Sequence, residues 1–102
     1  MDSSLLMLDL MRAFYWLDEQ LRARLAERGW HGITRSQSLV LANVGNGVTR
    51  ASRIATNLGV SRQAMSQLLG EMEANGLVEI TPDPGDRRAQ LVAFAGTAAG
   101  IR

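Results

Sequence analysis

Apolar residues recur at helical spacing through the first third of the chain. From Ser3 to Arg28 they lie three or four positions apart, and Gly29 follows as a stop signal. The first stripe consists of Leu6, Leu10, Phe14, Leu17, Leu21 and Leu25, and a second consists of Met7, Met11 and Tyr15. A small domain covers one stripe, which leaves two options for the other. Either the helix is buried centrally in its own chain, or, as we expect, it also packs on a second copy through Leu6, Met7, Leu10, Met11 and Phe14.

The segment "ITRSQSLVLANVGNG" predicts a short helix from about Arg35 to Val44. Thr34 and Gln37 have the spacing of a capping box, and the Gly-Asn-Gly sequence at 45–47 ends the helix. This glycine pair lacks the Gly-Lys-Ser/Thr ending of a phosphate-binding loop. We therefore interpret it as a turn.

Residues 49–76 predict two helices separated by a tight break, the arrangement of a helix-turn-helix. We expect Thr49 to cap the first helix, Gly59 to adopt the positive backbone angle of the turn, and Ser61 to cap the second. The inward side of the second helix is expected to carry Ser61, Met65, Leu68 and Met72. Its opposite side carries groups that hydrogen-bond to base edges, namely Arg62, Gln63, Ser66 and Gln67. The alternative for this side is a solvated polar face.

Two short strands, "LVEI" at 77–80 and "AQLVAF" at 89–94, follow the second helix. Between them Pro82, Pro84 and Gly85 predict a loop whose tip carries Asp86, Arg87 and Arg88. Such a hairpin is the wing of a winged helix-turn-helix, and an arginine on it is attracted to the negative potential of a DNA minor groove. Asp86 is expected to hold an arginine side chain in an extended rotamer. The alternative is a solvated surface turn.

The charge distribution supports a polyanionic partner. The net charge is only +1, but residues 28–70 carry five arginines and neither Asp nor Glu. Cysteine is absent and His31 is the one histidine, which argues against thiol chemistry, disulfides and an all-protein zinc site. No nucleophile and base pair suggests itself, so we expect no enzymatic activity, metal or cofactor.

Length and hydropathy limit the organisation of the chain. Its 102 residues suffice for one domain. We expect an N-terminal helix over 1–30, a winged helix-turn-helix over 34–95, and the start of a C-terminal helix or a tail over 96–102. The sequence contains neither a run of eighteen apolar residues nor a secretory leader, so a cytoplasmic protein without membrane contact is expected.

Residues 59–92, "GVSRQAMSQLLGEMEANGLVEITPDPGDRRAQLV", resemble the multiple antibiotic resistance regulator (MarR) family of bacterial transcription factors. The resemblance is carried by the helix exit Met72–Val78 and by the Asp-Arg-Arg sequence of the wing, and it extends over roughly residues 5–95. The family has a mainly α fold with a small antiparallel β-hairpin. The resemblance implies an obligate homodimer on pseudo-palindromic double-stranded operators, usually a repressor released by a small, often aromatic, ligand.

The resemblance also implies roles for individual residues. Arg62, Gln63, Ser66 and Gln67 would read the major groove, while Arg88, braced by Asp86 and next to Arg87, would enter the minor groove. Candidates for the phosphate backbone are Thr49, Arg50, Arg53 and Ser61. An alternative, a protein-interaction module without DNA binding, remains open, because winged helices also serve as docking domains.

Two features depart from the family pattern. Gly70 lies in mid-helix, where the family has a polar or charged residue. The helices that follow the wing and close the family's dimer are missing before Arg102. The sequence is thus a piece of a longer chain, a naturally short protein, or a member whose dimer rests on the first helix.

Overall fold

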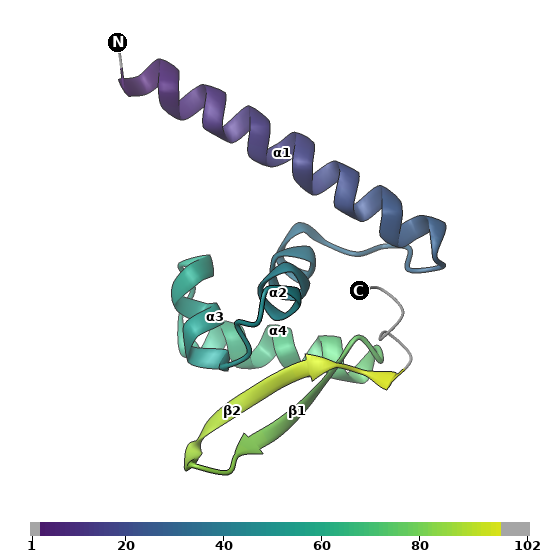
Figure 1. Ribbon diagram of the computed structural model, residues 1–102, viewed down its shortest axis with the longest axis vertical. Helices are drawn as coiled ribbons and strands as arrows, with labels where there is room; N and C mark the ends of the chain where they lie inside the picture. The colour runs from purple at the N-terminus through teal and green to yellow at the C-terminus, as the bar shows by residue number, and fades with distance from the viewer. Residues whose placement is uncertain (1–2, 97–102) are drawn as a thin grey trace. The chain divides into compact units, whose positions relative to one another are not determined.

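The computed structural model describes residues 3–96, and within them four helices and one two-stranded antiparallel sheet (Figure 1). The contacts group the chain into two compact units, residues 1–38 and 39–102, which we describe in turn. The elements are α1 (Ser3–Glu27), α2 (Arg35–Gly45), α3 (Ala51–Leu58), α4 (Arg62–Ala74), β1 (Val78–Asp83) and β2 (Asp86–Phe94). The order confirms the predicted winged helix-turn-helix fold. The expectation for residues 97–102 lies outside the described part of the chain.

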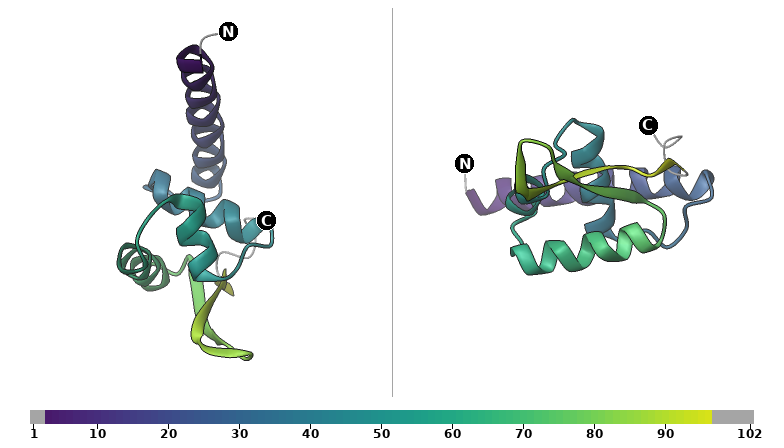
Figure 2. Two further views of the ribbon diagram at one scale, coloured as in Figure 1. Left: turned by 90° about the vertical axis from the view of Figure 1, so that its left-hand side faces the viewer. Right: turned by 90° about the horizontal axis from the view of Figure 1, so that it is seen from below.

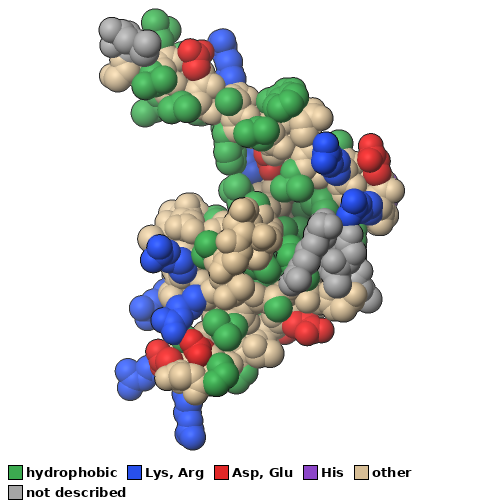
Figure 3. Space-filling model, in the orientation of Figure 1, with side chains coloured by type: hydrophobic (Ala, Val, Ile, Leu, Met, Phe, Trp, Pro, Cys, Tyr) green, Lys and Arg blue, Asp and Glu red, His purple; other side chains and the backbone are tan. Residues whose placement is uncertain are grey.

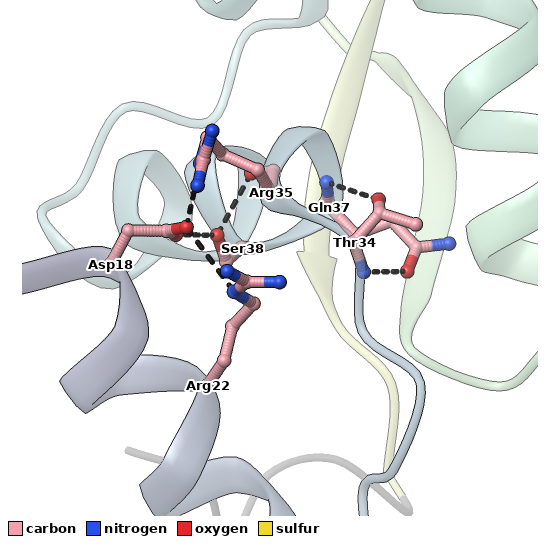
Figure 4. A network of polar contacts seen from close by, with 6 residues as sticks. All are labelled: Asp18, Arg22, Thr34, Arg35, Gln37 and Ser38. Atoms are coloured by element: carbon pink, nitrogen blue, oxygen red, sulfur yellow. Dashed lines mark hydrogen bonds and ion pairs between the residues drawn. The ribbon is translucent and has the colours of Figure 1, made fainter. Parts of the chain in front are cut away.

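Helix α1 ends at Glu27, one residue before the predicted limit, and Gly29 follows with φ 92°. The predicted capping box at the start of α2 is confirmed (Figure 4). The Thr34 amide donates to Gln37 Oε1 at 3.0 Å, and the Gln37 amide donates to Thr34 Oγ1 at 3.2 Å. Each side chain satisfies one of the amides that a helix start leaves unpaired.

A buried carboxylate links α1 to the first turn of α2 in the N-terminal unit. Asp18 is only 5% exposed. Its oxygens accept hydrogen bonds from Ser38 Oγ and from Arg35 Nε, the latter at 2.9 Å (Figure 4). Arg22 Nε lies 3.2 Å from the same carboxylate, and the guanidinium of Arg35 stacks over the Tyr15 ring. Burial acts to raise the pKa of Asp18, but the hydrogen bonds and the two arginine charges outweigh it, so the pKa is lowered.

The large apolar side chains of α1 are mostly exposed, and they form a row of hydrophobic groups along it (Figure 3). The exposed set is Leu5, Leu6, Met7, Leu8, Leu10, Met11, Phe14, Tyr15, Trp16 and Leu17. Among the described residues, no helix has the length and apolar character that crossing a bilayer requires.

The core of the C-terminal unit lies between α2, α3, α4 and the base of the hairpin. Its buried apolar residues are Val40, Leu41, Val44, Ile54, Ala55, Met65, Leu69, Met72, Leu77, Val78, Val92, Phe94 and Ala95. The prediction of Leu68 as the inward leucine of α4 was wrong, because Leu69 is buried and Leu68 is half-buried. Both fit helical spacing from Met65, so the packing of α4 decided between them.

The turn between α3 and α4 follows the prediction, but the start of α3 does not. Gly59 has φ 71°, and Ser61 caps α4 by accepting from the Ala64 amide at 3.1 Å. The residue at the N-cap of α3, however, is Arg50, whose side chain makes no capping bond. Thr49 is therefore not the cap. Its carbonyl instead accepts from the Val92 amide at 2.8 Å, which engages this segment with β2.

The hairpin is longer than the residue types predict. β1 continues through Pro82 to Asp83, so only Pro84 and Gly85 form the turn. Proline is tolerated there because β1 is an edge strand and pairs with β2 alone. The hairpin contacts α4 through β1 and α3 through β2 (Figure 2). Its alternating side chains bury Val78, Val92 and Phe94 near the base.

Candidate nucleic-acid interface

The polar side of α4 is exposed, as predicted. Arg62, Gln63, Ser66 and Gln67 are all exposed, while Met65 and Leu69 on the opposite side are buried. The first turn of α4 contains no acidic residue. Its unpaired amides and the positive end of the helix dipole therefore favour an anion such as a phosphate.

A hollow of about 460 Å³ separates the start of α3 and the polar side of α4 from β2. Three arginines line it, namely Arg50 at the N-cap of α3, Arg62 on α4 and Arg88 on β2, together with Ser66 and Asp86. Gln63 and Gln67 do not line the hollow. The fold thus brings part of the predicted base-reading set together with the wing, and it places the two glutamines elsewhere on the exposed surface.

The wing arginines lie on β2 rather than at the tip of a loop. Arg87 and Arg88 belong to the first three residues of the strand, and both are exposed. Asp86 Oδ1 accepts a hydrogen bond from the backbone amide of Arg88 at 3.0 Å. The contact that the structure shows for Asp86 thus fixes the backbone at Arg88 and not its guanidinium. The predicted role of Arg88 in a minor groove stays a prediction.

An ion pair that local sequence patterns did not indicate connects the start of α3 to the wing. Arg50 Nη2 donates to Asp83 Oδ2 at 2.7 Å, and Asp83 Oδ1 accepts from the Gly85 amide at 2.9 Å. The hydrogen bond from Arg50, followed by that from Gly85, lowers the pKa of Asp83, and the same pair raises the pKa of Arg50. Asp83 lies between two prolines, immediately before the turn, and an acid at that position is typical of a side chain that accepts from a turn amide.

A second missed residue fixes the base of the wing. The Glu73 carboxylate accepts from the Ile80 amide at 3.0 Å, which joins α4 to β1. Glu73 is part of the helix exit, and its partner Ile80 lies seven residues further along the chain, where helical spacing does not predict a contact.

Arginine side chains gather on the surface of α3, α4 and the wing, with few acids among them (Figure 3). Arg53 is exposed on α3, one turn after Arg50. Within residues 3–96 no three His, Asp or Glu side chains are placed to hold a metal ion. The surface combines the polar side of α4, a hollow lined by three arginines and a projecting hairpin. Such a surface can match the alternating grooves and phosphates of a duplex.

The family comparison agrees with this geometry. The model of the MarR family matches residues 31–89, which include α2, α3, α4, β1 and the start of β2. The chain belongs to the MarR family. Members of this family are transcriptional regulators and not enzymes.

One curated relative and two solved structures illustrate how similar individual proteins are to this chain. The transcriptional activatory protein BadR of Rhodopseudomonas palustris is 41% identical over 66 residues, which are 60% of this chain and 37% of BadR. RV1404 of Mycobacterium tuberculosis shares the fold with a TM-score of 0.75 at 22% identity, over 99% of this chain and 69% of that one. Overoxidized AbfR bound to DNA has a TM-score of 0.65 at 19% identity, over 98% and 72% of the two chains. The match thus spans little more than a third of the curated relative.

Proposed function

We propose that this MarR-family chain binds double-stranded DNA in a sequence-specific manner and regulates transcription. The observation that carries the proposal is the convergence of Arg50, Arg62 and Arg88 on one hollow beside the exposed polar side of α4. Family membership supports it, and one protein with the same fold has been solved bound to DNA.

In the proposed complex α4 lies in the major groove. Its N-terminal residues face the base edges, and the amide groups of Gln63 and Gln67 suit bidentate contact with adenine. Arg62 and Ser66 lie between these bases and the hollow. The capped start of α4 at Ser61, together with Thr49 and Arg53, faces phosphates, because a helix start with free amides attracts anions.

The wing follows the neighbouring minor groove. Arg88, with Arg87 beside it, projects from the start of β2 into that groove, where a narrow width strengthens the negative potential. The Asp86 carboxylate holds the Arg88 amide and thereby sets the strand direction at the point of entry.

We further propose that the chain acts as a homodimer through the apolar side of α1. The residues concerned are Leu6, Met7, Leu10, Met11 and Phe14, which are exposed in the chain by itself. Two copies related by a two-fold axis would read a pseudo-palindrome whose half-sites lie about one helical turn apart. The resemblance to the family adds a small aromatic effector that releases the DNA.

The sign of regulation is a separate question from DNA binding. The family resemblance implies a repressor, whereas BadR is by name a transcriptional activator. The same DNA-reading surface serves both, because the position of the operator relative to the promoter decides the outcome. A reporter gene with the selected operator placed over or upstream of its promoter decides between them.

Selection from randomised duplexes followed by salt titration tests the proposal. Each phosphate neutralised contributes about 0.9 to the slope of log K against log salt, so Arg88→Ala is expected to weaken binding and reduce the slope by about 1. Arg12→Ala, which removes an equal charge from an exposed position on α1, is the matched control and should leave the slope unchanged. Replacing Gln63 or Gln67 with Ala should relax the preference at one operator position, with about 1 to 3 kcal/mol at stake.

Absence of any retained duplex would refute DNA binding. Retention of a protein partner that resists added salt would then favour a protein-interaction module, since an apolar contact does not release counterions.

A further inference from the structure

We propose that Arg50 is a positioning residue that, by its ion pair with Asp83, fixes the direction of the wing relative to α3 and α4. The inference rests on the proposed DNA binding for its consequence, but its structural part is independent of DNA. It gives Arg50 a task different from the phosphate contact that its charge alone suggests.

Arg50 occupies a position where a different residue type would serve α3 better. It is the N-cap of α3, yet its side chain makes no capping bond, and Ser, Thr, Asp or Asn is favoured there. Its backbone forms a bridge with Leu91, next to the bond between the Thr49 carbonyl and the Val92 amide. The side chain is thus free to extend along β2 toward the turn, where it reaches Asp83 at 2.7 Å.

Asp83 uses its two oxygens for two different purposes. Oδ1 accepts from the Gly85 amide inside the turn, while Oδ2 accepts from Arg50 outside it. Asp83 also lies at the register irregularity of the hairpin, opposite Asp86. Because irregularities bend and twist a hairpin, a tie at this residue controls the direction in which the distal part points.

The hairpin needs such a tie because its base alone does not fix its far end. The apolar contacts at Val78, Val92 and Phe94 and the Glu73 to Ile80 bond all lie toward the base. Beyond them most residues of the strands are exposed, although Asp83 and Ala89 are half-buried, and an isolated two-stranded ribbon is only marginally stable in water. The Arg50 to Asp83 pair adds a side-chain contact between the end of β1 and the start of α3.

This ion pair is too exposed to matter much for unfolding. The Arg50 side chain is 52% exposed, although that of Asp83 is only 16% exposed, and pairs with one solvated partner at the surface contribute little to stability. We expect the ion pair instead to reduce the conformational mobility of the wing. A wing already held in place loses less conformational freedom when Arg88 enters a groove, which favours binding.

The first measurement compares wing mobility without DNA, by NMR order parameters of the amides from Gly85 to Arg88. We expect lower order parameters in Arg50→Ala and in Asp83→Asn, and unchanged ones in Arg50→Lys, which preserves the ion pair. Arg53→Ala, which removes an equal charge from the same helix, should leave the wing as rigid as in the wild type. A wing that stays rigid in both Arg50→Ala and Asp83→Asn overturns the inference, whether or not the chain binds DNA.

The second measurement uses the duplex selected by the wild type, at several salt concentrations. Arg50→Ala and Asp83→Asn should each weaken binding about fivefold, and the double variant should weaken it no further. Sequence preference should be lost at the operator positions that flank those read by α4. Glu79→Gln, which removes an exposed acid from the same strand as Asp83, controls for the loss of a negative charge. Thermal unfolding should stay unchanged in all of them.

A positioning role and a phosphate contact for Arg50 predict opposite changes in DNA affinity when Asp83 is replaced by Asn. If Arg50 were a phosphate contact, releasing it from Asp83 would strengthen binding, and Arg50→Ala would reduce the salt slope by about 1. That pair of results overturns the inference while leaving DNA binding intact. If the wild type retains no duplex, the proposed function fails, and the mobility measurement alone decides on the positioning role.

Discussion

The two units of this chain treat their apolar residues in opposite ways. Residues 39–96 bury theirs, so that Ile54, Leu69 and Met72 are all less than 2% exposed. In α1, by contrast, large apolar side chains remain in contact with solvent, and Leu10 is 63% exposed. A surface of this kind in a monomer marks an interaction site. The winged helix unit therefore buries most of its own apolar side chains, whereas α1 leaves most of its large ones exposed.

The charged groups differ in the same manner. In the N-terminal unit the Asp18 carboxylate is buried and paired with Arg22, Arg35 and Ser38. On the winged helix the arginines are exposed, and Arg62, Arg87 and Arg88 extend into solvent. Apolar groups are thus exposed in one unit and cationic groups in the other, as the proposed division between assembly and DNA binding requires.

The largest expected effect is on the free energy of unfolding, and it compares a buried leucine of the core with an exposed leucine of α1. Leu69→Ala should lower the free energy of unfolding by about 3 kcal/mol, because it leaves a cavity in place of a side chain that is only 1% exposed. Leu10→Ala, the matched change on α1, should leave the unfolding of residues 39–96 unchanged. Chemical denaturation, monitored residue by residue through amide hydrogen exchange, measures the unfolding free energy of residues 39–96 in both variants. An equal loss in the two variants would show that the contrast between the units is false.

The next effect concerns assembly. Leu10→Asp places a charge in the proposed apolar interface and should weaken dimerisation at least about 100-fold, because a carboxylate is costly to bury unpaired. Arg12→Asp, about 200° round the helix from Leu10, is the control. Light scattering over a concentration series measures the mass. A wild type that stays monomeric at high concentration, or a dimer that tolerates Leu10→Asp, contradicts assembly through this side of α1.

Most of the local structure could be predicted from residue types and spacing. The capping box at Thr34 and Gln37, the turn at Gly59 and the cap at Ser61 are all formed as expected. In each case the interacting atoms are within four residues of one another. Where two local solutions were equally good, as for Leu68 and Leu69, the sequence could not decide, because tertiary packing selects between them.

The missed features depend on residues far apart in the chain. Asp18 meets Ser38 across 20 positions, and Arg50 meets Asp83 across 33. Thr49 was predicted as a cap because its own position suits one, but pairing with β2 shifted the cap to Arg50. For the candidate interface, the exposed side of α4 could be predicted, whereas the arrangement of the wing arginines along β2 could not.

Asp18 provides a third test, with a smaller effect. Asp18→Asn should destabilise the N-terminal unit by about 2 kcal/mol, because it leaves Ser38 and two arginines without a buried anion. The folded pKa is lowered, so the contribution of the carboxylate is complete above its unfolded pKa of about 3.9 and is lost as the pH falls through the folded value. Unfolding measured from pH 7 to pH 2 should therefore bring wild type and variant together at the acid end. A constant difference across this range would mean that the charge of Asp18 is not what stabilises the unit.

The smallest expected effect is a gain, and it tests how closely α4 approaches its partner. Gly70 lies inside α4, and among the described residues a methyl group added there would meet nothing within 4 Å beyond its chain neighbours and the adjacent backbone of α4. Gly70→Ala should therefore raise the free energy of unfolding by about 0.5 to 1 kcal/mol through helix propensity and loss of freedom in the unfolded chain. DNA affinity should stay unchanged, since the proposed contacts lie at the N-terminal half of α4. If the variant is more stable but binds the selected duplex less tightly, α4 approaches the DNA closely as far along as Gly70, beyond the proposed contacts from Arg62 to Gln67. Only such a close approach would make one methyl group lower the affinity.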